Sequence, residues 1–404
     1  MAPAPPACHV SGRHYGLDWL RVAAFALLIL YHITLVFVPG HWVIKWPETF
    51  PALVVPLAFL TPWRLPLLFA VSGFATRRLL MRSPSLHDFA RGRSKRLLVP
   101  LAFGLLVLLV PELWVRARLA GDPLSLGQYW LREYWLPDPP YGLGFPAWEH
   151  LWFVLYLWVY TLLLVALVHA RGSDWVQARV EAFTARGRLL WAPIALLVAA
   201  RLSLMFVVPE RHGLFTDWSG HAQYVTFLLF GFALGGSPTL WRRIAAQARA
   251  SVPVALLSGC VVAWVEHAYP GSNVPPHLIA AAERGAQVAM AWSMLLLLLH
   301  AADRWLNRDA RLRATMAEAV FPAYLIHHPV IVVTTWAILP LGWPAGIGFA
   351  VLLGATTAAC VGFYLLARAL PWLRPFAGLG VLPPTRPRTG HGGGGIAVAR
   401  AHPP

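Results

Sequence analysis

Three polar residues, Asp18, Arg21 and His32, lie within the first long apolar run of the chain, LDWLRVAAFALLILYH. A helix turns about 100° and rises about 1.5 Å per residue, so Arg21 and His32 share one face about 16 Å apart, with Asp18 near the same stripe. Imidazole titrates near neutral pH and can take a proton from a hydroxyl, whereas guanidinium geometry suits phosphate or carboxylate. We therefore predict that His32 is a general base and Arg21 an anion clamp, with Asp18 as the partner of Arg21.

Each of these residues also has a structural explanation. His32 could be a packing histidine bonded to a neighbouring helix, and Arg21 could be a positive residue that reaches the membrane surface. Burying an arginine in a membrane costs at least about 2.5–3.5 kcal/mol, and such residues usually face a bundle interior or a wet cavity. An arginine and a histidine on one stripe therefore favour the functional interpretation.

The second apolar run, TPWRLPLLFAVSGFATRR, supplies two candidate substrate-binding residues, Arg64 and Ser72. Pro62 and Pro66 bracket Arg64 and predict a kinked or broken helix there. The Ser72-Gly73 pair allows a close backbone approach. A structural salt bridge would also explain Arg64, and the sequence leaves both possibilities open.

The remaining candidate substrate-binding residues are aromatic or histidine side chains further along the chain. They are His150 and Trp152 in EHLWFVLY, His327 and His328 in FPAYLIHHPV, and Trp135 in the aromatic segment 114–150. Two adjacent histidines on a helix point about 100° apart, so at most one faces the same cavity as His32. An interfacial aromatic belt explains the segment 114–150, and a carbohydrate site would also suit its aromatic and acidic residues.

Composition predicts which elements position these residues. The 404 residues are 58% hydrophobic and 12% charged, against about 25% charged in an ordinary soluble domain. Apolar runs of about 17–25 residues predict an all-α, polytopic membrane protein with about ten transmembrane helices. The predicted spans are 17–38, 53–76, 97–113, 151–170, 189–208, 219–236, 251–268, 279–300, 319–337 and 344–368.

The distribution of Lys and Arg predicts the orientation. With the N-terminus inside, twenty-four fall in inner segments, five in outer segments and four within spans. Segments rich and poor in Lys and Arg alternate with each predicted span. This pattern predicts ten crossings with both termini cytoplasmic. A formal charge of +16 is compatible with binding to nucleic acid. The basic residues, however, lie in short loops between apolar runs, so we expect no nucleic-acid partner.

The chain is predicted to have no further domain of useful size. We expect a cytoplasmic N-terminal segment (1–16), a membrane domain (17–370) and a disordered Pro/Gly-rich cytoplasmic tail (371–404). Cys8, Cys260 and Cys360 are too far apart for a disulfide framework or a metal-binding spacing, so no metal site is expected.

Four of these segments together resemble the membrane acyltransferase family 3. LDWLRVAAFALLILYH is similar to the family's first helix, and RLPLLFAVSGFATRR, EHLWFVLY and FPAYLIHHPV are similar to three later segments, in the family's order. With VFVPGHWVIKW after it, the first helix looks most like the branch that succinylates periplasmic glucans. The resemblance covers residues 16–370.

The resemblance implies a bacterial inner-membrane O-acyltransferase. The donor would be cytoplasmic acyl-CoA carrying an acetyl or succinyl group, with no permanently bound cofactor. The acceptor would be an extracytoplasmic carbohydrate or lipid-linked group. His32 matches the family's essential histidine and Arg21 its arginine partner; Arg64, His150 and His327/His328 also carry over.

Several alternatives stay open at this point. A transporter or exporter with intramembrane His and Arg would also fit the polar stripe. The sequence leaves open the acyl chain, the acceptor, the oligomeric state, and whether an acyl-histidine forms or transfer is direct.

Overall fold

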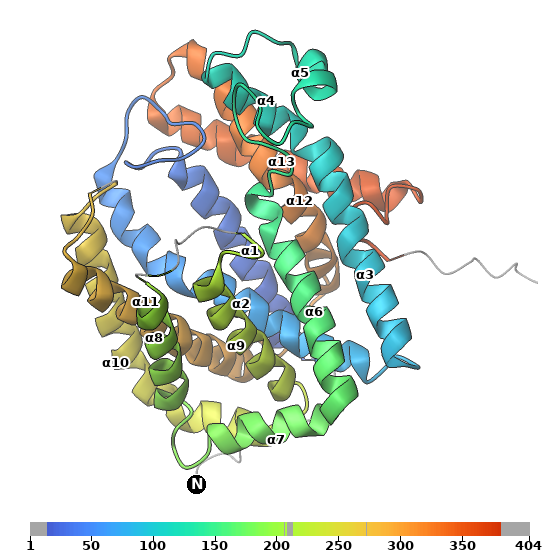
Figure 1. Ribbon diagram of the computed structural model, residues 1–404, viewed down its shortest axis with the longest axis vertical. Helices are drawn as coiled ribbons and strands as arrows, with labels where there is room; N and C mark the ends of the chain where they lie inside the picture. Colours follow the sequence, from blue (N-terminus) through green and yellow to red (C-terminus); the bar gives the residue numbers. More distant parts are fainter. Residues whose placement is uncertain (1–13, 206, 208–212, 272, 381–404) are drawn as a thin grey trace, which may run out of the picture.

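The structure is a computed structural model that describes residues 14–205, 207, 213–271 and 273–380. All regular elements in the described part are helices (Figure 1), which confirms the all-α prediction. In the first half these are α1 (Tyr15–Leu35), η1 (Pro51–Leu53), α2 (Val54–Leu80), α3 (Leu86–Phe103), η2 (Gly104–Leu108), α4 (Val110–Leu119), α5 (Leu126–Arg132), η3 (Glu149–Leu151), α6 (Trp152–Arg171) and α7 (Ser173–Phe183). The second half holds α8 (Trp191–Leu204), α9 (Trp218–Leu234), α10 (Pro238–Ala268), α11 (His277–Ala301), η4 (Ala302–Leu306), α12 (Arg313–Ile338), η5 (Leu339–Leu341) and α13 (Ala345–Ala369).

Eight helical segments of the described chain are long and apolar enough to cross a membrane, so the chain is a polytopic membrane protein. They match eight of the predicted spans, and α3, η2 and α4 together form one of them. The other two predicted spans, 189–208 and 219–236, correspond to the shorter helices α8 and α9, of 14 and 17 residues. Residues 206 and 208 of the first of these lie outside the described part.

The connections between the helices lie at two opposite ends of the bundle (Figure 1). We call one end the loop face, where α5 and residues 36–50 and 120–148 lie. The other end, where α1 begins, is the basic face; it includes residues 77–96, which contain seven Lys and Arg. Figure 1 shows α5 near the top and α7 at the bottom, so the two faces are well separated.

Two glycines allow α2 and α9 to pack with their backbones in contact. A Cβ atom on Gly73 would lie 2.0 Å from the Leu228 carbonyl oxygen, and one on Gly231 would lie 1.8 Å from the Ala70 carbonyl oxygen. Small residues commonly permit such approach between membrane helices. The close backbone approach predicted at Gly73 is therefore present, and it fixes α2, which carries Arg64, against α9.

Helix α1 is held between α2 and α12, with η4 near its first turn. Its apolar residues at helical spacing are buried: Leu17, Leu20, Ala24, Phe25 and Leu28. The first turn is held by a charge-assisted bond, because Arg313 Nη1 on α12 donates to Asp18 Oδ2 at 2.5 Å. These contacts fix the rotation of α1 and thus the direction in which its polar stripe faces.

Residues 371–380 pack against α13, whereas the sequence predicts a disordered tail from residue 371. Leu373, Ala377 and Leu379 are buried in a cluster with Tyr364 of α13. The Arg374 Nε atom donates to the Gly380 carbonyl at 2.8 Å. The rest of the predicted tail, 381–404, lies outside the described residues, as does the predicted N-terminal segment up to residue 13.

Candidate active site

The residues predicted to act together divide between two cavities at opposite ends of α1. The basic-face cavity, of about 480 Å³, is lined by Asp18, Arg21 and Ser72. The loop-face cavity, of about 780 Å³, is lined by His32, Arg64, His150, Trp152 and His328. Arg21 and His32 are eleven residues apart on one helix, or about 16 Å along its axis.

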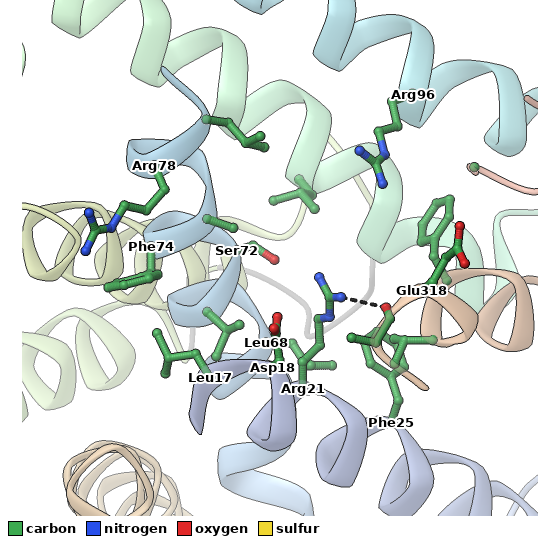
Figure 2. A pocket seen from close by; sticks show the side chains of 18 of the residues that line it. Leu17, Asp18, Arg21, Phe25, Leu68, Ser72, Phe74, Arg78, Arg96 and Glu318 are labelled. Carbon is green, nitrogen blue, oxygen red and sulfur yellow. Dashed lines mark hydrogen bonds between the residues drawn. The ribbon is translucent and has the colours of Figure 1, made fainter. Parts of the chain in front are cut away.

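The basic-face cavity is rich in arginine. Figure 2 shows Arg96 of α3 pointing toward Arg21 of α1. The two carboxylates that line the cavity already have cationic partners outside its lining: Asp18 is bonded by Arg313, and Glu318 lies 3.7 Å from Arg374. Five arginines line this cavity: Arg21, Arg78, Arg82, Arg93 and Arg96. The cavity therefore presents a net positive surface, which suits a polyanion.

Arg21 is held in place by α12. Its Nη2 atom donates to the Ala317 carbonyl at 2.6 Å, the bond drawn in Figure 2. The pairing of Asp18 with Arg21 stays a prediction. The structure gives Asp18 a second cation that was not predicted, Arg313, which donates to it from α12. Sequence spacing along α1 could not reveal a residue that arrives from α12.

The loop-face cavity combines histidines, arginines and aromatic rings. Its polar lining includes Arg201, Gln223 and Gln287, which were not predicted. Tyr31, Trp42, Trp148, Trp152, Tyr224 and Tyr324 supply aromatic surface. Aromatic faces beside hydrogen-bonding groups are a surface that suits a sugar.

Arg64 is the buried cation of this cavity, with a side chain only 3% exposed. Its guanidinium carbon lies 3.6 Å above the centre of the Tyr31 ring, and its Nε atom donates to the Leu60 carbonyl at 3.0 Å. Its Nη1 atom is buried and has no hydrogen-bond partner. The side chain is therefore fixed while part of its donor capacity is unused.

Four histidines from three helical segments meet beside this cavity: His32, His150, His327 and His328. His32 Nδ1 lies 3.0 Å from His327 Nε2, and His327 Nδ1 lies 2.7 Å from the Tyr324 carbonyl oxygen. His328 lines the cavity and His327 lies behind it, as their angular separation on α12 requires. The cluster thus gives His32 a direct partner that does not face the cavity.

Pro329 explains how His150 is held. Proline has no N–H, so it leaves the carbonyl four residues earlier, that of Leu325, without its helical donor. His150 Nε2 donates to this oxygen at 3.3 Å, and the Tyr324 hydroxyl donates to the His150 carbonyl. The sequence FPAYLIHHPV therefore binds η3, the turn that precedes α6, to α12 beside His32.

Glu112 and Arg116 belong to the site but were not predicted. Glu112 is fully buried and accepts a hydrogen bond from His328 Nδ1 at 2.9 Å. Arg116 Nη2 donates to Glu149 Oε2 at 2.5 Å and lies 3.7 Å from Glu112 Oε1. An acid inside the apolar run VPELWVR, four residues before an arginine, was the available signal.

Glu112, His150 and His328 are also the described residues that could hold a metal ion. One potential ligand atom from each lies within 4.8 Å of the others, and all three side chains are buried. Two histidines and one carboxylate are a ligand set known for zinc. The three lie far apart in the sequence, so no ligand spacing could have indicated them.

Trp135 lies away from both cavities. Its ring packs against Tyr134 and Phe145 at centroid distances of 5.0 and 5.2 Å, and it is 42% exposed. From the same segment, residues 143–144 and 147–150 line the loop-face cavity instead, including Trp148. Periodicity cannot determine which aromatic residue of an irregular loop turns inward.

Comparison with protein families identifies the chain. A family model described as "Acyltransferase domain" matches residues 14–366. The chain belongs to this acyltransferase family. It is therefore a polytopic membrane protein of an acyltransferase family, and the resemblance to acyltransferase family 3 is confirmed.

More detailed similarity is limited to part of the chain. The chain is 28% identical over 169 residues to "Glucans biosynthesis protein C" of Escherichia coli SMS-3-5, and 27% identical over 169 residues to that of strain K12. Each match covers 41% of this chain and 40% of the relative, so the chain spans less than half the length of these curated relatives. No solved structure matches the chain significantly.

Proposed function

We propose that this protein transfers an acyl group from cytoplasmic acyl-CoA to a hydroxyl of an extracytoplasmic carbohydrate. The observation that carries the proposal is the pair of cavities at the two ends of α1, one lined by arginines and the other by histidines and aromatic rings. Two substrates that approach from opposite sides of a membrane need such an arrangement. The acyl group would be acetyl or succinyl.

The donor would bind at the basic-face cavity. The phosphates of coenzyme A are anionic, and guanidinium groups bind phosphate through paired hydrogen bonds. The seven Lys and Arg of residues 77–96 add to the positive field around this entrance.

The thioester would reach His32 along the polar stripe of α1. The distance from Arg21 to His32, about 16 Å, is comparable to an extended pantetheine arm. Phe153 lines both cavities, so the two spaces adjoin at its ring. The arm would pass this ring and deliver the acyl carbon close to His32.

The acceptor would bind in the loop-face cavity. Its aromatic lining and its Gln, Glu and Arg side chains suit stacking on and hydrogen bonding to a sugar. The name of the relatives, "Glucans biosynthesis protein C", supports a glucan as the acceptor.

In the proposed reaction, the acyl group passes directly from coenzyme A to the acceptor. His32 takes the proton of the acceptor hydroxyl as the oxygen forms a bond to the acyl carbon. The carbon–sulfur bond breaks, and the coenzyme A thiolate receives the proton from His32. Arg64 stabilises the negative charge that develops on the acyl oxygen.

The direct test uses purified protein in lipid nanodiscs with acetyl-CoA or succinyl-CoA and glucan oligosaccharides. We expect free coenzyme A and acylated oligosaccharide in equal amounts, measured by mass spectrometry. A protein that releases no coenzyme A, but drives oligosaccharide uptake into proteoliposomes, would be a transporter instead.

The orientation gives a first prediction. If the basic face is cytoplasmic, reporter fusions at Arg91 and Tyr134 should give opposite signals, with Arg91 inside and Tyr134 outside. Paired alkaline phosphatase and fluorescent-protein fusions at each position measure this. The same side at both positions would contradict the ten-span arrangement.

The division between the cavities gives a second prediction. Arg21→Lys keeps the charge but loses the planar fork, so we expect KM for acyl-CoA to rise about tenfold, with little change in KM for the acceptor. Trp148→Ala should do the reverse because Trp148 lines the loop-face cavity. Trp135→Ala, in the same loop but outside the cavity lining, should have a smaller effect than Trp148→Ala. A rise in acceptor KM with Arg21→Lys would contradict this sidedness.

A further inference from the structure

We infer that His327 is a positioning residue that fixes the tautomer of His32, leaving the free lone pair on His32 Nε2. The catalytic meaning of this inference rests on the proposed acyl transfer. The hydrogen-bond chain itself makes a separate prediction about substrate-free protein.

The hydrogen-bond chain that ends at His32 starts at a backbone carbonyl, that of Tyr324. The Tyr324 oxygen can only accept, so the atom 2.7 Å from it, His327 Nδ1, must carry a hydrogen. A neutral imidazole has one N–H, which leaves His327 Nε2 as an acceptor. That atom lies 3.0 Å from His32 Nδ1, so His32 donates from Nδ1, and its Nε2 atom has no hydrogen.

The surroundings of His327 favour the neutral form that this chain requires. Its side chain is 0% exposed, and its hydrogen bonds in the described structure are to the Tyr324 carbonyl and to His32. A charged imidazole in the interior needs a carboxylate beside it. Glu112 lies beside His328, whereas the described contacts of His327 include no carboxylate.

The carbonyl at the start of the chain is itself well fixed. Tyr324 lies one helical turn before His327 on α12. Its hydroxyl donates to the His150 carbonyl, and its ring packs edge-on against Phe25 of α1 at a centroid distance of 5.5 Å. The residue that supplies the acceptor for His327 Nδ1 is therefore held against both η3 and α1.

The tautomer decides whether His32 can act as a base. With the hydrogen on Nδ1, the Nε2 lone pair can accept the proton of the acceptor hydroxyl. The imidazolium that forms keeps its Nδ1–H bond to His327. With the opposite tautomer, Nε2 would carry a hydrogen and could not accept one. His327 does not line the loop-face cavity, so it would act through His32 rather than on the substrate.

The first measurement compares two substitutions at one position. His327→Leu removes the acceptor, and we expect kcat to fall about 10- to 100-fold, the loss that corresponds to one buried hydrogen bond. KM for both substrates should stay near wild type. His327→Gln provides an amide oxygen that can accept from His32 Nδ1, and it should recover most of kcat.

The second measurement needs no substrate. Diethyl pyrocarbonate reacts with an unprotonated imidazole nitrogen, and mass spectrometry of the peptide containing His32 gives the rate at that residue. We expect a several-fold slower reaction at His32 in His327→Leu than in wild type. His41, an exposed histidine of the loop face, is the matched internal control and should react equally in both.

The outcomes separate the alternatives. A wild-type kcat in His327→Leu, or an unchanged reaction rate at His32, would overturn the inference. So would equal losses in the Leu and Gln variants with a lowered Tm, because that pattern indicates packing alone. If His327→Leu slows the diethyl pyrocarbonate reaction at His32 but the wild-type protein transfers no acyl group, the hydrogen-bond chain is supported and the proposed function is rejected.

Discussion

Replacing His32 with glutamine is expected to abolish acyl transfer, with a fall in rate of about 10²–10⁴-fold, the usual loss for one catalytic acid–base group. Glutamine keeps some of the volume, and its amide can still donate to His327 Nε2, the atom that His32 contacts at 3.0 Å. It has no lone pair basic enough to take a proton from a hydroxyl. His32→Ala should be equally inactive, because the lost function is basicity rather than packing.

The measurement is the release of coenzyme A and the formation of acylated oligosaccharide by purified variants of equal thermal stability. His41→Gln is the matched control, since His41 is an exposed histidine of the loop face that lines neither described cavity. Near-normal turnover by His32→Gln would reduce His32 to a packing residue. A loss of turnover accompanied by a lower Tm would point to misfolding, and His32→Ala would then have to be inactive at normal stability for the assignment to stand.

Much of the fold could be predicted because membrane helices are encoded locally. Length and apolarity determine each span, and the eight long helical segments lie where the apolar runs predicted them. Helix α8 shows the limit of this rule. Its predicted span ran to residue 208, but the helix ends at Leu204. Apolar composition alone does not determine where a helix ends.

The polar stripe of α1 could be predicted for the same reason. Asp18, Arg21 and His32 are related by the period of one helix, and the structure directs Arg21 and His32 into two different cavities. The partners that these residues have on α12 could not be predicted, because they come from a helix that is distant in the sequence. Arg313 bonds Asp18 and His327 bonds His32, at sequence separations of 295 residues in both cases. Helical periodicity carries no information about which face of a distant helix will be adjacent.

Glu112 illustrates a different limit. Taken alone, a glutamate in an apolar run resembles the other acids near the membrane surface. The spacing to Arg116, on the same helix, was readable, but its contact with His328 of α12 becomes visible only when α4 packs against α12. A buried acid without partners would be costly, so a glutamate within an apolar run indicates a partner on another helix.

Arg64→Gln is expected to have the second largest effect, a loss of about 10²–10³ in kcat, as when one donor to a developing oxyanion is removed. The physical reason is preorganisation. The Tyr31 ring and the Leu60 carbonyl hold the guanidinium, while its buried Nη1 atom has no partner in the protein. A donor that is already fixed and already desolvated can stabilise negative charge with little reorganisation.

The same contacts explain why the variant should still fold. The described contacts of Arg64 include no carboxylate, so its removal leaves no unpaired acid in the bundle. Arg64→Lys should give an intermediate rate, because it keeps the charge but loses the planar fork that stacks on Tyr31. Arg242→Gln, at an exposed arginine of α10, is the matched control. Steady-state kinetics with varied donor and acceptor decide the role. A fall in kcat at constant KM places the interaction of Arg64 in the transition state, whereas a raised acceptor KM at normal kcat would mean that Arg64 only binds the acceptor.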